Sequence, residues 1–213
     1  MAGYKERLIF MNESTTKEPK INLENSVNEI LKAIDQDRER EIITRRFGLF
    51  DRRETLEQIG DLLGITRERV RQLEKSILSK LKTAAENGKI SVIPSLEKVL
   101  IRELSENGRV ARVSDLTDLI VGRTSSQIER SRVAFIATLS PHLTVLDQND
   151  YYYQSVGISE YDDVKKMKEK IDSIVSVIRK QGQPMTPEQI HEKLDFEHPS
   201  YIKSMASLSK LLA

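Results

Sequence analysis

The residues TLEQIGDLLGITRERVRQLEKSILSKLK (55–82) have the pattern of a helix, a tight turn and a second helix. Thr55 opens a T-x-x-Q capping box, which marks the start of the first helix. Gly64 suits the end of that helix, because glycine adopts a left-handed backbone at little cost. Thr66 has the side chain to cap the second helix, and Gly60 leaves room for that helix to cross closely.

The second helix has an apolar face and a charged face when about 100° of rotation is assigned to each residue. The apolar face can pack on the first helix and consists of Val70, Leu73, Ile77 and Leu81. The other face carries side chains that read base edges in a DNA major groove, and these are Arg67, Glu68, Arg71 and Gln72. Arginine can donate twice to guanine, glutamine can pair with adenine, and glutamate can accept from cytosine N4. The alternative is a solvated face on an ordinary amphipathic helix, but the preceding helix, turn and caps favour DNA binding.

Residues from about 23 to 82 resemble region four, the carboxy-terminal DNA-binding region of the housekeeping-type bacterial sigma factors. Two strings carry the resemblance, DREREIITRRFGL at 37–49 and TLEQIGDLLGITRERVRQLEKSILSKLK at 55–82. In that family this helix-turn-helix reads the upstream (minus thirty-five) promoter element, and the first half docks on the flap of the RNA polymerase beta subunit. The resemblance therefore implies double-stranded promoter-like DNA and bacterial RNA polymerase as partners.

Carried over by position, the resemblance implies the same four base readers and adds contacts to DNA phosphates. The phosphate contacts that the resemblance implies are Arg38, Arg46, Thr55, Thr66 and Arg69. The helical wheel adds Lys75, which lies with Lys82 on the side of the base readers. Thr55 and Thr66 also fit on physical grounds, because helix N-termini offer N–H groups and a partial positive charge to phosphate. Arg69 lies away from the reading face, which suits a backbone contact, whereas Arg38 and Arg46 rest on the resemblance alone.

The sequence lacks other parts of a working sigma factor. Such a protein also binds the polymerase clamp, recognises the downstream promoter element and melts DNA, and those regions carry a long aromatic-rich helix. Here aromatic residues make up 5% of the chain and tryptophan is absent. We therefore expect region four detached from the other regions and joined to something else.

Composition narrows the class of protein. The net charge is only +1, so positive charge is local, with six Lys or Arg against two Glu in residues 66–82. The absence of cysteine excludes disulfides, thiol nucleophiles and cysteine zinc sites. The histidines His142, His191 and His198 are scattered, so we expect no metal, no cofactor and no enzymatic activity. Without a membrane-length apolar run or a signal-peptide pattern, we expect a soluble protein of the bacterial cytoplasm, associated with the nucleoid.

The predicted fold is mainly α, with a helix-turn-helix domain followed by two small winged-helix-like modules. We expect a flexible segment at 1–20, the helix-turn-helix domain at 21–88, and the modules at 92–157 and 161–213. In the first domain, Ser26 and Glu29 form a candidate capping box. The middle module shows a helix from Ser95 to Glu106, a strand at 110–113, a helix capped by Ser114, a helix from about Ser125 to Leu139, and a hairpin turning at 148–150.

The last module repeats the start of this order. It shows a helix at 161–180, a short strand at 183–185, the strong helix start Thr186-Pro187-Glu188-Gln189, and a helix at 201–212. Its arrangement is similar to HARE-type winged helices of bacterial chromatin and transcription proteins. The sequence stops where a wing would be expected, so the module is either wingless or truncated.

Either winged-helix-like module could contact DNA or dock on protein. Arg123, Arg130 and Arg132 lie near the predicted reading helix of the middle module, but Glu129 interrupts them. The three tyrosines 151–153 are expected to be strand residues rather than base-stacking groups, with at least one packed inward.

We interpret the chain as a sequence-specific DNA-binding transcription protein that recognises promoter-like DNA, RNA polymerase or both. One alternative is an adaptor that docks on RNA polymerase or another partner without reading bases. Another is the front part of a larger protein whose activity lies beyond Ala213. A small helix-turn-helix buries limited surface, so we expect residues 1–88 alone to bind DNA weakly and with strong dependence on salt.

Overall fold

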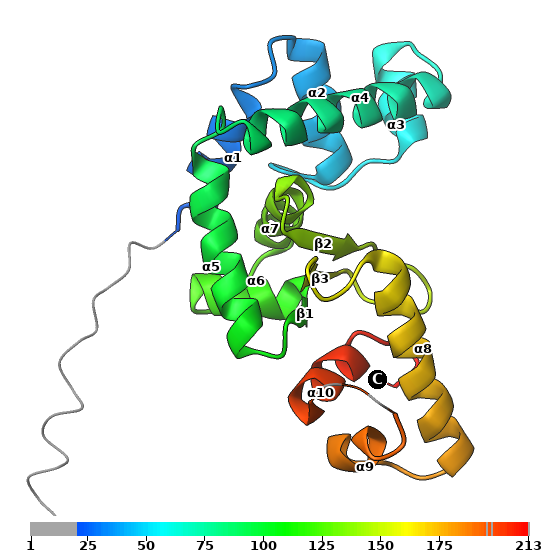
Figure 1. Ribbon diagram of the computed structural model, residues 1–213. Helices are drawn as coiled ribbons and strands as arrows, with labels where there is room; N and C mark the ends of the chain where they lie inside the picture. Colours follow the sequence, from blue (N-terminus) through cyan, green and yellow to red (C-terminus); the bar gives the residue numbers. More distant parts are fainter. Residues whose placement is uncertain (1–20, 195, 197, 213) are drawn as a thin grey trace, which may run out of the picture.

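The structure, a computed structural model, describes residues 21–194, 196 and 198–212, and the segment 1–20 that we expected to be flexible lies outside them. The chain is mainly helical with one small antiparallel sheet (Figure 1). The helices are α1 (Leu23–Leu31), α2 (Asp37–Phe47), α3 (Leu56–Leu63), α4 (Arg67–Glu86), α5 (Val92–Glu106), α6 (Val113–Val121), α7 (Gln127–Leu139), α8 (Val164–Gln181), α9 (Pro187–His191) and α10 (Pro199–Ser207). The strands are β1 (Val110–Arg112), β2 (Leu143–Leu146) and β3 (Ser155–Ile158).

The predicted helix-turn-helix is formed by α3 and α4, and its caps are confirmed. The Thr55 hydroxyl oxygen accepts from the Gln58 N–H at 3.2 Å, and the Gln58 side chain accepts from the Thr55 N–H at 2.9 Å. Gly64 ends α3 with a left-handed φ of 63°. A Cβ on Gly60 would lie 2.7 Å from the Ile65 carbonyl oxygen, so this glycine allows the turn itself to fold back on α3.

Two predicted caps are wrong, for different reasons. The helix α1 begins at Leu23 because the Asn22 side chain accepts from the Asn25 N–H at 3.0 Å, which leaves Ser26 inside the helix. The helix α6 begins before Ser114, and the N–H of its first residue donates to the Gln154 carbonyl at 2.8 Å. A backbone carbonyl 41 positions away in the chain therefore satisfies the N–H of the first residue of α6, and Ser114 lies inside the helix.

The middle segment has the element order that we predicted for a winged helix. The elements run α5–β1–α6–α7–β2–β3, and the strands pair antiparallel in the order β1-β3-β2. The loop of the hairpin is longer than the turn at 148–150 that we predicted, because Leu146 pairs with Ser155 and leaves residues 147–154 as a loop. The three tyrosines lie in this loop and not on a strand. Tyr152 still packs inward at 7% exposure, while Tyr151 is 57% exposed.

The last segment closes onto this loop. The helix α10 ends at Ser207 and does not run on to 212. Beyond it, the Tyr153 N–H donates to the Leu208 carbonyl at 2.9 Å, and the Lys210 N–H donates to the Tyr151 carbonyl at 2.8 Å. The predicted strand at 183–185 is not formed. The backbone after α10 thus satisfies its hydrogen bonds on the neighbouring segment instead of in a longer helix.

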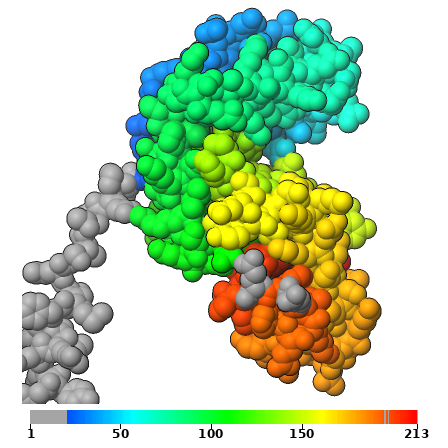
Figure 2. Space-filling view, viewed as in Figure 1, coloured from blue at the N-terminus to red at the C-terminus, as the bar shows by residue number. Residues whose placement is uncertain are grey.

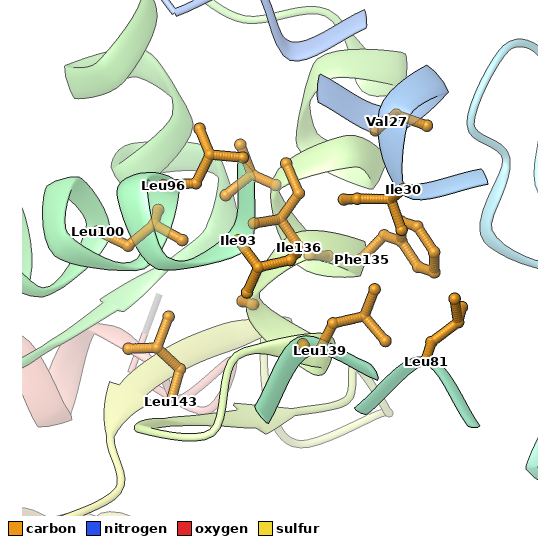
Figure 3. Packing of buried hydrophobic residues seen from close by; sticks show 14 of the residues in the cluster. Val27, Ile30, Leu81, Ile93, Leu96, Leu100, Phe135, Ile136, Leu139 and Leu143 are labelled. Carbon is orange, nitrogen blue, oxygen red and sulfur yellow. The ribbon is translucent and has the colours of Figure 1, made fainter. Parts of the chain in front are cut away.

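The helix-turn-helix domain and the middle module, which we predicted as separate units, share one hydrophobic core, while the last segment packs in a cluster of its own. The helix α7 lies at the centre of the shared core, between the helix-turn-helix and the sheet (Figure 1). Figure 3 shows how the side chains meet: the labelled residues are Val27 and Ile30 of α1, Leu81 of α4, Ile93, Leu96 and Leu100 of α5, Phe135, Ile136 and Leu139 of α7, and Leu143 of β2. Figure 2 shows the resulting continuous surface from the helix-turn-helix at the top to the last segment at the bottom.

A buried arginine reinforces the contact between α7 and the region 21–88. The Arg132 side chain on α7 is 10% exposed, and its guanidinium donates to the Leu49 carbonyl at 2.9 Å and to Glu24 at 3.1 Å. The rings of Phe47 on α2 and Phe135 on α7 also pack together, with centroids 4.9 Å apart. A buried charge needs such partners, because removing one of them leaves an uncompensated ion. The region 21–88 therefore packs directly on α7.

Replacement of Phe135 by alanine tests the shared core. We expect the change to lower the free energy of unfolding by about 3–5 kcal/mol, the usual effect of emptying a buried aromatic site. Hydrogen exchange should quicken in α1 and α4 as well as in α5, because their side chains pack in the same cluster. The exposed Lys98→Ala on α5 is the matched control and should change exchange little. Faster exchange confined to residues 92–158 would show that this segment and the region 21–88 fold independently of each other.

Candidate nucleic-acid interface

The helix α4 separates an inner and an outer face as its periodicity predicts. Val70, Ile77 and Leu81 are at most 2% exposed and pack against the rest of the chain. The four predicted base readers, Arg67, Glu68, Arg71 and Gln72, all lie on the exposed face of the first two turns. The structure thus brings these four side chains together on an accessible surface of a helix that is held in place from behind.

The base readers contact one another. Both oxygens of Glu68 accept from Arg71, at 2.7 and 2.8 Å, and the Gln72 side chain donates to one of them at 3.2 Å. The hydrogen bond from Arg71 lowers the pKa of Glu68 to about 2 and raises the pKa of Arg71. Arg67 pairs instead with Glu57 of α3 at 2.9 Å. In the free protein, the charges of this face are therefore largely compensated within it.

The predicted phosphate contacts fall into two groups. Thr55, Thr66, Arg69 and Lys75 are exposed on or beside the N-terminal halves of α3 and α4. Thr66 caps α4, since its hydroxyl oxygen accepts from the Arg69 N–H at 3.2 Å. Lys75 forms no ion pair with the described residues and borders a shallow hollow that Arg71 and Lys82 also line. These groups are free to face an anion.

Arg38 and Arg46 are already engaged within the fold. Arg46 contacts both oxygens of Glu74 at 3.2 Å, and its side chain is 23% exposed. Arg38 donates to the Leu63 carbonyl at 2.7 Å, at the end of α3. The two arginines thus tie α2 to α4 and to α3. A phosphate at either site would have to share or replace these partners.

Two further cations, which the sequence argument did not single out as contacts, lie near these residues in the fold or in the sequence. Lys82 lies on the same side of α4 as Lys75, and Arg52 is exposed three residues before Thr55. Neither forms an ion pair with the residues that the structure describes. The helical wheel placed Lys82 on the reading side, but Arg52 lies in a loop whose course no periodicity reveals.

The predicted reading helix of the middle module is not available to DNA along most of its length. The buried residues of α7 include Arg132, which holds the joint to the helix-turn-helix. Arg130 donates to the Ser125 hydroxyl at 2.9 Å, and Arg123 pairs with Glu129 at 2.7 Å. The hairpin loop 147–154, which would be the wing, is also in contact with the end of the described chain, because the Lys210 side chain donates to the Asn149 carbonyl at 2.6 Å. The described chain uses these elements for its own packing.

A buried polar cluster in the last segment has a structural role. Lys170 lies 2.7 Å from Asp162 and 3.0 Å from the Tyr201 hydroxyl, which itself donates to Asp162. Asp162 is 1% exposed, and its contacts with Lys170 of α8 and Tyr201 of α10 hold these two helices together. Among the described residues, no group of three or more metal-ligating side chains occurs. Nor does any helix of this part of the chain have the length and apolarity to cross a membrane.

Comparison with known proteins places the helix-turn-helix in a family. Residues 36–83 match the family described as sigma-70, region 4. Over 78 residues the chain is 40% identical to the RNA polymerase sigma factor sigB of Arabidopsis thaliana. The matched segment is 35% of this chain and 14% of that relative. No solved structure matches the chain significantly. Region-four domains are DNA-binding domains of transcription and are not themselves enzymes.

The pairing of Glu68 with Arg71 makes a prediction about titration. The carboxyl pKa of Glu68 should lie near 2, and Arg71→Ala should return it toward the ordinary 4.5. Carboxyl chemical shifts followed by NMR across an acid titration measure both. The folded-state pKa is depressed, so the stabilisation from this pair is present above pH 4.5 and is lost as the pH falls toward 2.

Glu129 supplies an internal reference in the same titration. Its pKa is also lowered to about 2, first by a hydrogen bond from Arg123 in the loop before α7. Arg71→Ala should leave the Glu129 titration unchanged. Ordinary titration of Glu68 in the unaltered protein would contradict the pairing.

Proposed function

Because residues 36–83 are a sigma region-four domain, we propose that this chain recognises promoter-like duplex DNA through the first two turns of α4. The observation that carries the proposal is the exposed cluster of four base-reading side chains on a helix whose opposite face is buried. A helix fixed from behind presents its outer side chains to a groove with little loss of conformational freedom on binding. We propose that the protein acts in transcription without catalysis or a cofactor of its own.

Each side chain has a role that its chemistry suits. Arg67 and Arg71 would donate to guanine, Gln72 would pair with adenine, and Glu68 would accept from cytosine N4. Thr55, Thr66, Arg69 and Lys75 would contact phosphates, supported by the N-termini of α3 and α4. Arg38 and Arg46 would contribute after giving up part of their present hydrogen bonds, and Arg52 and Lys82 would extend the phosphate-binding border.

RNA polymerase is the second proposed partner. The flap contact implied by the resemblance falls on the first half of the domain, where Phe47 packs on Phe135 of α7. Polymerase would therefore dock on the parts of α1 and α2 that α7 leaves exposed, or would have to displace α7. Displacement would expose a large apolar cluster and is energetically unfavourable. An adaptor that grips polymerase without reading bases is the alternative function.

A full-chain experiment separates these functions. Selection of bound sequences from a random duplex pool should return a motif with defined bases, and purified bacterial core RNA polymerase should be captured by the same protein. Polymerase capture with no selected motif would support the adaptor. The full chain is required, because the region 21–88 shares its core with α7 and is not expected to be stable alone.

The roles of reading and phosphate-binding residues can be distinguished by mutation. Arg71→Ala should change the preferred sequence, with a loss of about 1–3 kcal/mol at one base pair. Lys75→Ala should weaken all sequences alike and reduce the slope of log affinity against log salt by about 0.9. Binding to the selected motif and to its single-base variants, measured over a salt series, gives both quantities.

Arg38→Ala should also weaken all sequences about equally. It removes a hydrogen bond to the end of α3 as well, so its thermal stability must be measured beside its affinity. An equal loss at every sequence for Arg71→Ala would remove this residue from the set of base readers.

A further inference from the structure

Glu68 and Arg71 satisfy each other in the free protein. The Arg71 Nε and one terminal nitrogen donate to the two carboxylate oxygens at 2.8 and 2.7 Å. The two side chains are 58% and 55% exposed, so water and DNA can reach the pair. Among the described residues, only Gln72 makes a further hydrogen bond to this pair. The pair therefore forms a small unit on the surface, independent of the packing behind α4.

The donors that bind Glu68 are the ones that DNA would need. A guanidinium presents a planar fork, and the same edge fits a carboxylate, a phosphate, or the O6 and N7 atoms of guanine. These acceptors compete for one set of N–H groups. The Nε and Nη2 edge of Arg71 can thus bind DNA only after it leaves Glu68, while the Nη1 N–H groups stay outside the pair.

We propose that Glu68 is a specificity-determining residue that restrains Arg71 from DNA phosphates and releases it where the sequence offers a partner to both side chains. This inference rests on the proposed reading of bases by α4. It assigns Glu68 a role in rejecting wrong sequences, in addition to its contact with cytosine.

The restraint favours correct sequences because of what happens to the carboxylate after release. At a matching site, guanine accepts from Arg71 and the N4 amino group of cytosine donates to Glu68, so both charges keep partners. At other sequences Arg71 can still reach a phosphate, but Glu68 is then left without its donor beside a polyanion. An unpaired charge at an interface is unfavourable, so the cost falls on non-matching sites.

The neighbouring cations fit the same pattern, in which base-reading arginines are paired with carboxylates and phosphate-binding cations are not. Arg67, another proposed base reader, is also held by a carboxylate, at 2.9 Å from Glu57. Lys75, a proposed phosphate contact one turn further along α4, has no ion pair among the described residues. The face thus combines restrained arginines where bases are read with a free lysine where only the backbone is contacted.

The test compares Glu68→Gln with Glu86→Gln, which removes the same charge from the far end of α4. Both use the full chain, the selected duplex and a scrambled duplex over a salt series. For Glu68→Gln we expect about two- to fivefold tighter binding to scrambled DNA, the effect of freeing one exposed ion pair. The salt slope should steepen by about 0.9, because one more phosphate is contacted. The ratio of selected to scrambled affinity should fall, whereas Glu86→Gln should leave that ratio unchanged.

A double-mutant cycle isolates the restraint from general charge effects. In an Arg71→Ala background, Glu68→Gln should no longer steepen the salt slope, because no arginine is left to release. The inference is overturned if Glu68→Gln leaves scrambled binding unchanged, if Glu86→Gln has an equal effect, or if the slope still steepens without Arg71. If the unaltered protein binds both duplexes equally, the proposed base reading fails first. Discrimination by the unaltered protein with no effect of Glu68→Gln overturns the restraint alone.

Discussion

The packing of α7 against α1, α2 and α4 holds most of this molecule together. Phe135 lies fully buried in a cluster that draws side chains from α1, α4, α5 and β2, and Arg132 closes its edge with hydrogen bonds to Leu49 and Glu24. Burial of so much apolar surface is the main stabilising contribution available to a chain without disulfides. The helix-turn-helix is consequently mounted on the following segment and does not move as a tethered unit.

This arrangement divides the functions of two helices that sequence patterns alone would treat alike. Both α4 and α7 follow a helix and a turn, and both carry arginines near their N-terminal ends. The inner face of α4 is buried and its outer face is open, whereas α7 is buried over most of its length. One candidate recognition helix therefore remains available to DNA, and the other has become a structural element that supports it.

Charge compensation on the outer face of α4 shows how the proposed nucleic-acid interface would fit within a nearly neutral chain. Arg67 and Arg71 have carboxylate partners at hydrogen-bonding distance, so they add little to long-range attraction for DNA. Uncompensated cations such as Lys75 supply that attraction. In such a surface, specificity depends on the exchange of protein partners for bases, and affinity depends on the free cations.

Local sequence was enough to predict the helix-turn-helix, its caps at Thr55 and Thr66, the left-handed Gly64 and the two faces of α4, because each depends on residues within about one or two helical turns. Local reasoning failed at Ser26, where Asn22 offered an earlier cap, and at Ser114, which lies inside a helix whose first N–H donates to the Gln154 carbonyl. The burial of Arg132 and the pairing of residues 208–210 with the 147–154 loop were decided by tertiary structure. These contacts join residues that are 55 to 108 positions apart. No period or spacing encodes which distant partner a side chain will meet, so only the folded chain shows that α7 is covered while α4 stays open.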